Sequence, residues 1–232
     1  MGIIDFHTHI LPAVDDGSKN VETSIQMLSE EFRQGIEKVV LTPHFYPNHD
    51  SPQRFLERRK KAEIKLIEEM PKHQEMPEIR FGAEVYFFDG ISDCEFISGL
   101  AIEDTKSIMI EMPLRRWSDR MIYELDGIRQ KQSLTPIIAH IDRYVDFIDK
   151  DVFRKLSDVG VLIQANAEFF ISRKTRKNAL KMLGRGDIHL LGSDCHDLTE
   201  RRPNLNEALE VIISNLGEEA VKFINGCEGP VL

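Results

Sequence analysis

Cysteine is scarce in this sequence, and the few cysteines show no paired spacing. Among 232 residues only Cys94, Cys195 and Cys227 are cysteines. An odd count without paired spacing argues against a disulfide framework and favours a reducing compartment. We therefore expect a cytoplasmic protein.

Long apolar runs are also missing. No stretch approaches the roughly 20 apolar residues that a transmembrane helix needs, so membrane insertion is not expected. The first residues, MGIID, lack the basic and apolar regions of a secretory signal. The sequence contains no internal repeat, low-complexity tract or Gly/Ser linker, and we expect residues 1–232 to form a single domain.

Positive charge is in deficit. The chain has 30 Lys and Arg residues against 39 Asp and Glu residues, which gives a formal net charge of −9. Non-specific nucleic-acid binding relies on clustered Lys and Arg, so nucleic acid is not an expected partner. An anionic substrate stays compatible with this composition if positive charge is supplied locally, for example by bound metal ions, which composition does not count.

The sequence does contain a regular alternation of short, β-branched apolar runs with segments of helical period. The apolar runs are Ile3–Phe6, Lys38–Thr42, Ile79–Ala83, Ser107–Ile110, Pro136–Ala139, Val161–Ala165 and His189–Gly192. The helical segments are Val21–Gly35, Pro52–Met70, Ser118–Gln132, Asp151–Asp158 and Thr175–Gly184. Strands that alternate with helices indicate an α/β fold with parallel pairing and right-handed crossovers. Seven strands can close into a barrel or remain an open, doubly wound sheet.

Ionisable side chains stand at the carboxyl ends of most of these runs. Six of the seven runs are followed within two residues by His, Asp or Glu. Together with Asp16, the candidates are His7, His9, Asp16, His44, Glu84, Glu111, His140, Asp194 and His196. In a parallel barrel all carboxyl ends converge on one face, whereas an open sheet spreads them along a line. Convergence of so many strand ends therefore favours the barrel.

His7 and His9 illustrate why this set predicts a metal site. In an extended strand, residues i and i+2 point to the same side, so two imidazoles are aimed at one spot. An isolated H-x-H pair can equally be exposed or hydrogen-bonded, and the interpretation depends on the whole set. Nine candidates exceed the three or four protein ligands of one ion, and two or three ions would account for them. Imidazole nitrogen and carboxylate oxygen suit Mn, Fe or Zn, and Mg less well.

Some of the candidates have alternative interpretations. Asp15 or Asp16 could cap the helix predicted after them, although both stand a few residues early for that role. We favour Asp16 as a ligand and keep Asp15 as a weaker candidate. Glu84, Glu111 and His140 end apolar runs, where an unpaired ionised group would be costly to bury, and this favours cation ligation.

Six short motifs resemble a known superfamily. The segments DFHTH, LTPH, GAE, IEMP, AHIDRY and GSDCH, in this order, resemble the polymerase-and-histidinol-phosphatase (PHP) superfamily. Within it, HILPAVDDGS followed by AHIDRY and GSDCHDLTERRPNL is similar to the bacterial metal-dependent protein-tyrosine phosphatases of the CpsB/YwqE type. The resemblance runs from Ile3 to about Asn225. It implies a distorted (β/α)7 TIM-like barrel, the PHP fold, with three divalent metal ions that are usually Mn²⁺.

The resemblance also implies roles for single residues. One ion would be held by His7, His9, Glu84 and Asp194, a second by Glu84, Glu111 and His140, and the third by Asp16, His44 and His196. Arg143 and Arg201 fall where the family has phosphate-binding arginines. The expected Arg-Pro-Pro-Asn of the last motif is RRPN here, with Arg202 in place of the first proline. Either Arg201 or Arg202 could therefore face the phosphate.

A second, competing motif lies in the same segment. Cys195 and Arg201 have the C-x5-R spacing of cysteine-dependent tyrosine phosphatases, which need a depressed thiol pKa and a loop of backbone N–H groups around the phosphate. The intervening residues include no glycine, and Asp197 and Glu200 would oppose thiolate formation. We interpret the spacing as coincidental and expect Cys195 to pack behind the two candidates that flank it.

The same resemblance implies an activity and a partner. The activity is hydrolysis of phosphotyrosine in proteins by a metal-activated hydroxide. The partner would be a bacterial tyrosine kinase of capsular or exopolysaccharide synthesis. Two alternatives remain: a small-molecule phosphatase such as histidinol phosphatase on the same fold, and a metal-binding regulator without catalysis.

Basic residues after the strands allow two interpretations. Arg115, Arg116 and the segment Arg173–Lys177 either guide a phosphorylated substrate toward the site or form a solvated charged surface. For the basic residues of the predicted helix 52–70 we expect a solvated surface. These residues are Arg54, Arg58, Arg59, Lys60 and Lys61.

Overall fold

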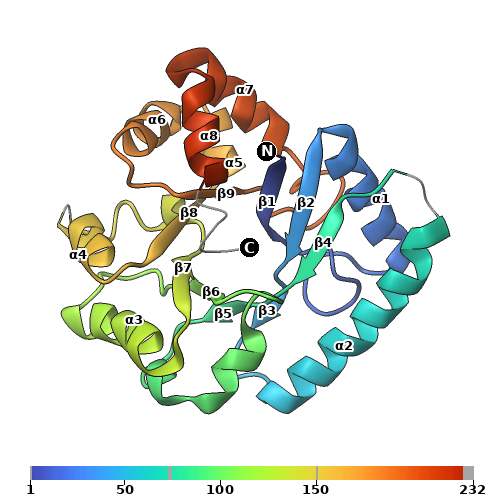
Figure 1. Ribbon diagram of the computed structural model, residues 1–232, viewed down its shortest axis with the longest axis horizontal. Coiled ribbons are helices and arrows are strands. Elements are labelled where there is room, and N and C mark those ends of the chain that lie inside the picture. Colours follow the sequence, from blue (N-terminus) through green and yellow to red (C-terminus); the bar gives the residue numbers. More distant parts are fainter. Residues whose placement is uncertain (1, 73–74, 150, 227–232) are drawn as a thin grey trace.

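The strands of the protein form a ring. The computed structural model describes residues 2–72, 75–149 and 151–226, and in it the helices cover the outside of the parallel strands (Figure 1). One sheet has the order β1 (Ile3–Thr8), β2 (Ile36–Leu41), β4 (Glu78–Phe81). The other has the order β3 (His44–Phe45), β5 (Glu84–Tyr86), β6 (Ser107–Glu111), β7 (Thr135–Ile138), β8 (Leu162–Asn166), β9 (Leu190–Gly192).

The two sheets meet where β1 lies beside the end of β9. Thr8 forms a parallel bridge with Cys195, and the N–H of His9 donates to the carbonyl of Cys195 at 2.9 Å. The N–H of Asp194 donates in the same way to the carbonyl of His7 at 2.8 Å. The curled, parallel α/β ring confirms the predicted TIM-like fold class.

Two of the predicted strands are interrupted. The chain leaves β2 at Leu41 and resumes as β3 at His44, with Pro43 between them, and proline cannot donate a ladder hydrogen bond. In the same way two residues separate β4 from β5. Because β3 pairs with β5 in a register that sets His44 opposite Glu84, the interruptions place two candidate ligands side by side.

The predicted helices form within two residues of their expected ends. They are α1 (Val21–Arg33), α2 (Pro52–Glu69), α3 (Asp119–Gln132), α4 (Val152–Asp158) and α6 (Arg176–Gly184). Local signals explain the first two starts: the side chain of Asn20 accepts from the N–H of Thr23 at 2.9 Å, and Ser51 caps α2 ahead of Pro52.

Further helices were not predicted from the sequence. The α-helices among them are α5 (Ala167–Ile171), α7 (Leu205–Leu216) and α8 (Glu218–Gly226). The 3-10 helices are η1 (Met70–Lys72), η2 (Ile91–Asp93), η3 (Glu95–Leu100) and η4 (Ile141–Arg143). None of the helices in the described part of the chain combines the length and apolar character that crossing a membrane requires.

Buried apolar side chains form two layers. The larger, outer layer lies between the strands and the helices. A smaller, inner layer draws most of its side chains from strands on opposite sides of the ring (Figure 1), so it fills the interior. The inner layer consists of Ile4, Phe6, Val40, Ile102, Met109, Ile137, Ala139 and Leu190.

Candidate metal centre

A bulge in β1 turns His7 and His9 toward the interior of the ring. The register of β1 against β2 shifts between Asp5 and Thr8. Phe6 and His7 together therefore lie opposite a single residue of β2. Without the extra residue, His7 would point away from the inner layer to which Phe6 belongs, because successive side chains of a strand alternate. The bulge puts both imidazoles inside, with their Nε2 atoms 3.1 Å apart.

Two further candidates have a left-handed backbone conformation. His140, after β7, has φ of 34°, and Asp194, after β9, has φ of 56°. Such values are uncommon for residues other than glycine and cluster at functional sites. Nearby, Gly192 allows the close approach of β9 to β1, since a Cβ at this position would lie 2.6 Å from the Cβ of His7.

Glu84 occupies the middle of the candidate set. It is buried at the start of β5, next to the interruption that precedes this strand. Its carboxylate oxygens lie near four imidazoles. The distances are 2.6 Å to Nε2 of His140, 2.8 Å to Nδ1 of His44, 3.2 Å to Nε2 of His7 and 3.4 Å to Nε2 of His9. A carboxylate in this position can bridge two cations.

Asp194 and Glu111 flank this carboxylate on two sides. Oδ1 of Asp194 lies 3.3 Å from Nε2 of His9 and 3.7 Å from Nε2 of His7. The carboxylate of Glu111, at the end of β6, lies 4.0 Å from ring nitrogens of both His44 and His140.

The remaining candidates meet nearer the solvent. Oδ1 of Asp16 lies 3.7 Å from Nε2 of His44 and 3.6 Å from Nε2 of His196. The side chain of Asp16 is 67% exposed, whereas that of His196 is 4% exposed. The structure therefore brings all nine sequence candidates into one cluster that is buried at one end and open at the other.

The donor set fits divalent cations. The side chains form three groups, and within each group all ligand atoms lie within 4.8 Å of one another. They are His9, Asp16, His44 and His196; His7, His9 and Asp194; and His44, Glu84 and Glu111. Six of the ten buried side-chain polar atoms without a hydrogen-bond partner in the described part of the chain belong to this cluster. These are Nδ1 of His44, Oε2 of Glu84, Oε2 of Glu111, Nδ1 of His140, Oδ1 of Asp194 and Nε2 of His196. Buried polar atoms are normally paired, and cations would supply partners for donors of this chemistry.

Opposite charges balance one another inside the cluster. Burial disfavours the imidazolium of His7, but the carboxylates of Glu84 and Asp194 outweigh burial and raise its pKa above the ordinary 6.5. Burial likewise disfavours the carboxylates, but His7 and the neighbouring imidazoles hold the pKa values of Glu84 and Asp194 well below their ordinary range. A metal ligand must be a neutral imidazole, so any proton that His7 carries would have to leave before a cation binds.

His9 and His196 differ although their rings lie against each other. Burial opposes protonation of His9, but the neighbouring carboxylate of Asp15 raises its pKa well above the ordinary value. For His196, burial and the positive charges of His9 and Arg201 lower the pKa to about 4. The ring of His196 is therefore neutral near pH 7 and available as a nitrogen donor.

Asp15 lies behind His9 rather than among the donor groups. Its Oδ2 accepts from Nδ1 of His9 at 2.6 Å and from the N–H of His44 at 2.9 Å. A carboxylate on the far nitrogen fixes the orientation of a metal-binding imidazole and raises its basicity. Asp15, a weaker ligand candidate in the sequence, is placed by the geometry as a positioning residue.

Two amides that the sequence analysis missed hold the cluster together. Oε1 of Gln164 accepts from the N–H of His140 at 2.6 Å and lies 3.2 Å from Nδ1 of His7. Its amide donates to Asn166 at 3.0 Å, and the Asn166 amide donates to Asp194 at 2.9 Å. Both amides stand on β8, the predicted strand that carries no ionisable residue at its end. The sequence did contain a signal for these two residues, because two side-chain amides stand two residues apart at the end of a predicted strand.

Two arginines reach the cluster from its open side. A terminal guanidinium nitrogen of Arg143 lies 2.8 Å from Oδ2 of Asp194, and one of Arg201 lies 2.9 Å from Oδ1 of the same carboxylate. Their side chains are 35% and 40% exposed. Arg202 points elsewhere, since it pairs with Glu207 at 2.6 Å. The geometry therefore places Arg201 at the cluster.

Cys195 packs behind the cluster, as its position between two inward-facing residues predicts. It is fully buried in the outer apolar layer, and its Sγ lies 3.8 Å from a carboxylate oxygen of Glu31 in α1. Burial and the negative charges of Glu31 and Asp5 raise the pKa of the thiol well above its ordinary value. A cysteine-dependent phosphatase needs an accessible thiolate, so the structure excludes that use of Cys195.

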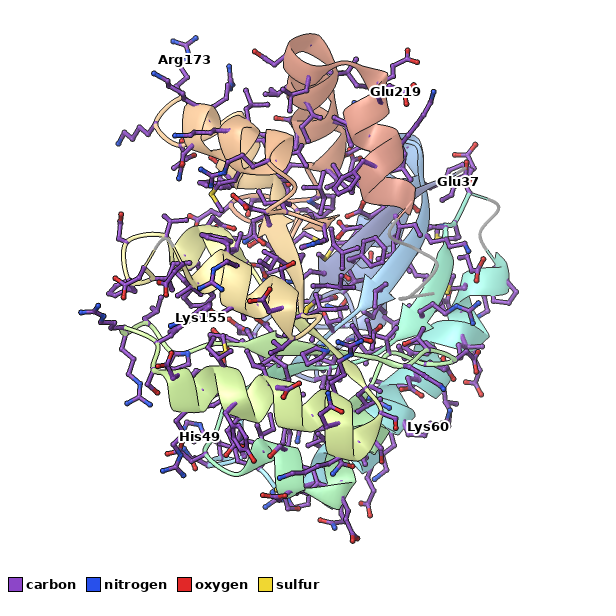
Figure 2. All side chains as sticks on the ribbon, turned by 60° about the vertical axis from the view of Figure 1, so that its left-hand side comes forward. Glu37, His49, Lys60, Lys155, Arg173 and Glu219 are labelled. Atoms are coloured by element: carbon purple, nitrogen blue, oxygen red, sulfur yellow. The ribbon has the colours of Figure 1, made fainter. Side chains whose placement is uncertain are left out.

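Most of the basic residues that follow the later strands do not face the cluster. Arg116 pairs with Asp149 at 2.6 Å, and Arg176 donates to backbone carbonyls of α5 at 3.0 and 2.6 Å. In Figure 2, Arg173 lies near the top of the molecule, whereas His49, which lines the cleft beside the cluster, lies near the bottom. For these residues the structure favours the solvated or structural alternative.

The sequence profile of the capsular polysaccharide synthesis family CpsB/CapC matches residues 3–228. The chain belongs to this family. The tyrosine-protein phosphatase CpsB of Streptococcus pneumoniae is 30% identical, over 95% of this chain and 93% of its own length. The tyrosine-protein phosphatase YwqE of Bacillus subtilis is also 30% identical, over 94% of this chain and 86% of its own length.

A solved structure confirms the fold of the CpsB/CapC chain. Crystal structures of YwqE from Bacillus subtilis and CpsB from Streptococcus pneumoniae are described as those of unique metal-dependent tyrosine phosphatases. The match has a TM-score of 0.79 and covers 99% of this chain and 94% of that chain, at 23% identity. At this identity it speaks for the fold. The resemblance to the CpsB/YwqE type, predicted from the segments HILPAVDDGS, AHIDRY and GSDCHDLTERRPNL, is confirmed.

Proposed function

We propose that this chain is a metal-dependent phosphatase that hydrolyses phosphotyrosine in proteins. The observation that carries the proposal is the cluster itself: five imidazoles and four carboxylates converge, and the guanidinium groups of Arg143 and Arg201 lie beside them. Cations bind such donors, and arginines bind phosphate oxygens. The names of the CpsB and YwqE relatives support tyrosine phosphate as the substrate.

The cluster would hold three divalent ions, for which we propose Mn²⁺, with Fe or Zn as alternatives. His7, His9, Glu84 and Asp194 would hold one ion, Glu84, Glu111 and His140 the second, and Asp16, His44 and His196 the third. When bound, such ions lower the pKa of coordinated water and offset the charge of a phosphoryl group. The exposed side of Asp16 leaves the third position open to a substrate.

Side chains of the protein would bind the phosphate, and the leaving group needs little further help. Arg143 and Arg201 would hold non-bridging phosphate oxygens, because both are partly exposed and both already lie on the Asp194 carboxylate. A tyrosine leaving group has a pKa near 10, so strong general-acid assistance is not required. Tyr46 stacks on His44 with ring centroids 5.0 Å apart, and burial together with Glu111 raises the pKa of its hydroxyl, which stays protonated.

The biological setting is proposed from the family. Its description is capsular polysaccharide synthesis, and we propose that the substrate is a bacterial tyrosine kinase of polysaccharide synthesis, dephosphorylated in the cytoplasm by a single domain that spans residues 1–232. No covalent phosphoenzyme is expected, because the cysteine in the last motif is buried behind the cluster.

The test combines metal analysis with activity on a phosphotyrosine peptide. Chelation should remove the metal and abolish hydrolysis, and added Mn²⁺ should restore both. His9→Ala should lose metal and activity, while the control Cys195→Ser should keep them. Full activity of the chelated protein would contradict metal dependence, and a preference for histidinol phosphate would contradict the proposed substrate.

A further inference from the structure

A basic groove lies on the outside of the ring, next to the candidate metal centre. It has a volume of about 510 Å³ and runs between the segment before α1 and one face of α2. These two helices lie side by side on the same side of the ring (Figure 1). Its charged lining residues are Lys19, Arg54, Glu57, Arg58, Lys61 and Lys65. Five cations against one carboxylate stand out in a chain whose net charge is −9.

The cations of α2 share a single helix face. Arg54, Arg58, Lys61 and Lys65 are spaced by four, three and four residues, which aligns them along the helix. Other basic residues of α2 are engaged elsewhere: Arg59 and Lys60 both pair with Glu63, at 3.0 and 3.1 Å, and Lys60 is labelled in Figure 2. The basic residues of this helix thus fall into two sets, of which one lines the groove.

The groove cations retain free capacity to bind anions. Within the described part of the chain, no ion pair involves Lys19, Lys61 or Lys65. Both groove arginines contact Asp50, Arg58 by a donated hydrogen bond of 2.6 Å and Arg54 by an ion pair of 3.8 Å, but the buried Nε of Arg58 has no hydrogen-bond partner among the described residues. An anionic ligand would therefore not have to displace many existing contacts.

The groove continues toward the metal centre. Arg54 and Arg58 also line a second cleft of about 410 Å³. That cleft is bordered by Asp16 and His44, two of the candidate ligands, and by Tyr46. A chain whose phosphotyrosine entered the centre through this cleft would meet the basic groove on its way along α2.

We propose that the groove binds an acidic segment next to the phosphotyrosine of the substrate protein. The inference rests on the proposed phosphatase function and adds a substrate preference to it. Four cations between Arg54 and Lys65 span about 16 Å of helix axis, the length of about five residues of extended peptide. Glu and Asp carboxylates along such a peptide complement the lining charge, and complementary charge promotes both encounter and register.

The experiment compares two phosphotyrosine peptides that differ only in their flanks, glutamate in one and glutamine in the other. Three proteins are assayed: the unaltered chain, the groove variant Lys61→Gln/Lys65→Gln, and the control Lys177→Gln/Lys181→Gln. The control pair has the same spacing and exposure on α6. Binding of both peptides to each protein is measured by fluorescence anisotropy, beside kcat and KM and the hydrolysis of a small aryl phosphate.

The unaltered protein should bind and hydrolyse the acidic peptide better than its glutamine counterpart. The groove variant should raise KM for the acidic peptide by about fivefold, with kcat and small aryl phosphate hydrolysis unchanged, and the control should match the unaltered protein. Equal use of both peptides by all three proteins would overturn the groove while leaving the phosphatase intact. Lysine-dependent binding of the acidic peptide without any hydrolysis would support the groove and refute the proposed function.

Discussion

Two layers inside the ring are chemically opposite: the apolar layer is fully buried, whereas the polar layer is buried at one end and open to solvent at Asp16. The inner apolar layer and the candidate metal centre follow one another along the same strands, as with Phe6 and His7 or Met109 and Glu111. Burial of an aliphatic side chain stabilises the fold by about 1.5–3 kcal/mol. Burial of ionised groups is costly unless they are paired. The apolar layer therefore stabilises the ring by itself, whereas the polar layer depends on internal charge pairs or on bound cations.

The contrast explains how one small interior can be both stable and reactive. Fixed apolar side chains hold the strands in register, and this register positions the donors at the strand ends. The polar cluster keeps oxygens and nitrogens in the interior that have charged neighbours but no hydrogen-bond partner among the described residues, an arrangement that a fold selected for stability alone would avoid. The free energy of cation binding then becomes part of the stability of this layer.

The largest effect should follow from removing the central carboxylate. Glu84→Gln takes away the negative charge that contacts four imidazoles, and we expect phosphatase activity to fall on the order of a thousandfold with loss of metal. The reason is that removing a ligand exceeds the 10–100-fold effect of removing a partner that only orients one. Metal content and kcat are the measurements. A variant that keeps its metal and its rate would show that Glu84 does not hold the centre.

Metal affinity should depend strongly on pH. Carboxylate neighbours raise the pKa values of His7 and His9 above 6.5 in the metal-free protein, so both imidazoles keep a proton to higher pH than an ordinary histidine, and that proton must leave when a cation binds. Apparent affinity should therefore rise as pH rises, by up to about tenfold per pH unit for each displaced proton, until the pH passes both pKa values.

Calorimetric titration with Mn²⁺ in buffers of different ionisation enthalpy would count the released protons. Affinity independent of pH between 6 and 8, roughly the range around the ordinary histidine pKa, would mean that the paired imidazoles are already neutral. The polar layer would then not be held together by charge pairs between imidazolium and carboxylate groups.

A smaller effect should come from the residue behind His9. The neighbouring imidazole outweighs burial and lowers the pKa of Asp15 to about 2, so Asp15 is ionised at any working pH. Asp15→Asn keeps the size but removes the charge, and we expect metal affinity or activity to fall by about 10–100-fold. The control is Asp158→Asn on the exposed side of α4, which pairs with Arg154. An unchanged metal affinity in Asp15→Asn would make Asp15 a packing residue.

Sequence reasoning predicted the convergence of the candidate donors because their positions follow from a local rule. Parallel strands of a barrel share one carboxyl end, so a His or Glu that follows an apolar run is placed there regardless of distant contacts. His140 and Asp194 show this, although the left-handed backbone that turns them inward has no signature in their own residue types. The identity of the bound metal stays a prediction.

Other features depend on contacts between distant segments and escaped the sequence analysis. The bulge at Phe6 and His7 is defined by the pairing of β1 with β2, and β1 also meets the segment after β9 through Thr8 and Cys195. Gln164 becomes important only because β8 lies next to β7 and places its amide under His140. The basic groove likewise requires α2 to lie against the segment before α1. Charge spacing along a helix cannot distinguish such a face from a solvated one.

The smallest effect should come from trimming the apolar layer. Ile137→Val removes one methylene from a fully buried side chain of β7, and we expect the free energy of unfolding to fall by about 1 kcal/mol, with metal content and kcat unchanged. Urea denaturation with and without Mn²⁺ measures this. The loss should be the same in both conditions, because the two layers share strands but not interactions. A loss that disappeared when metal was bound would mean that the cations also stabilise the packing around Ile137, and that the two layers act as one cooperative unit.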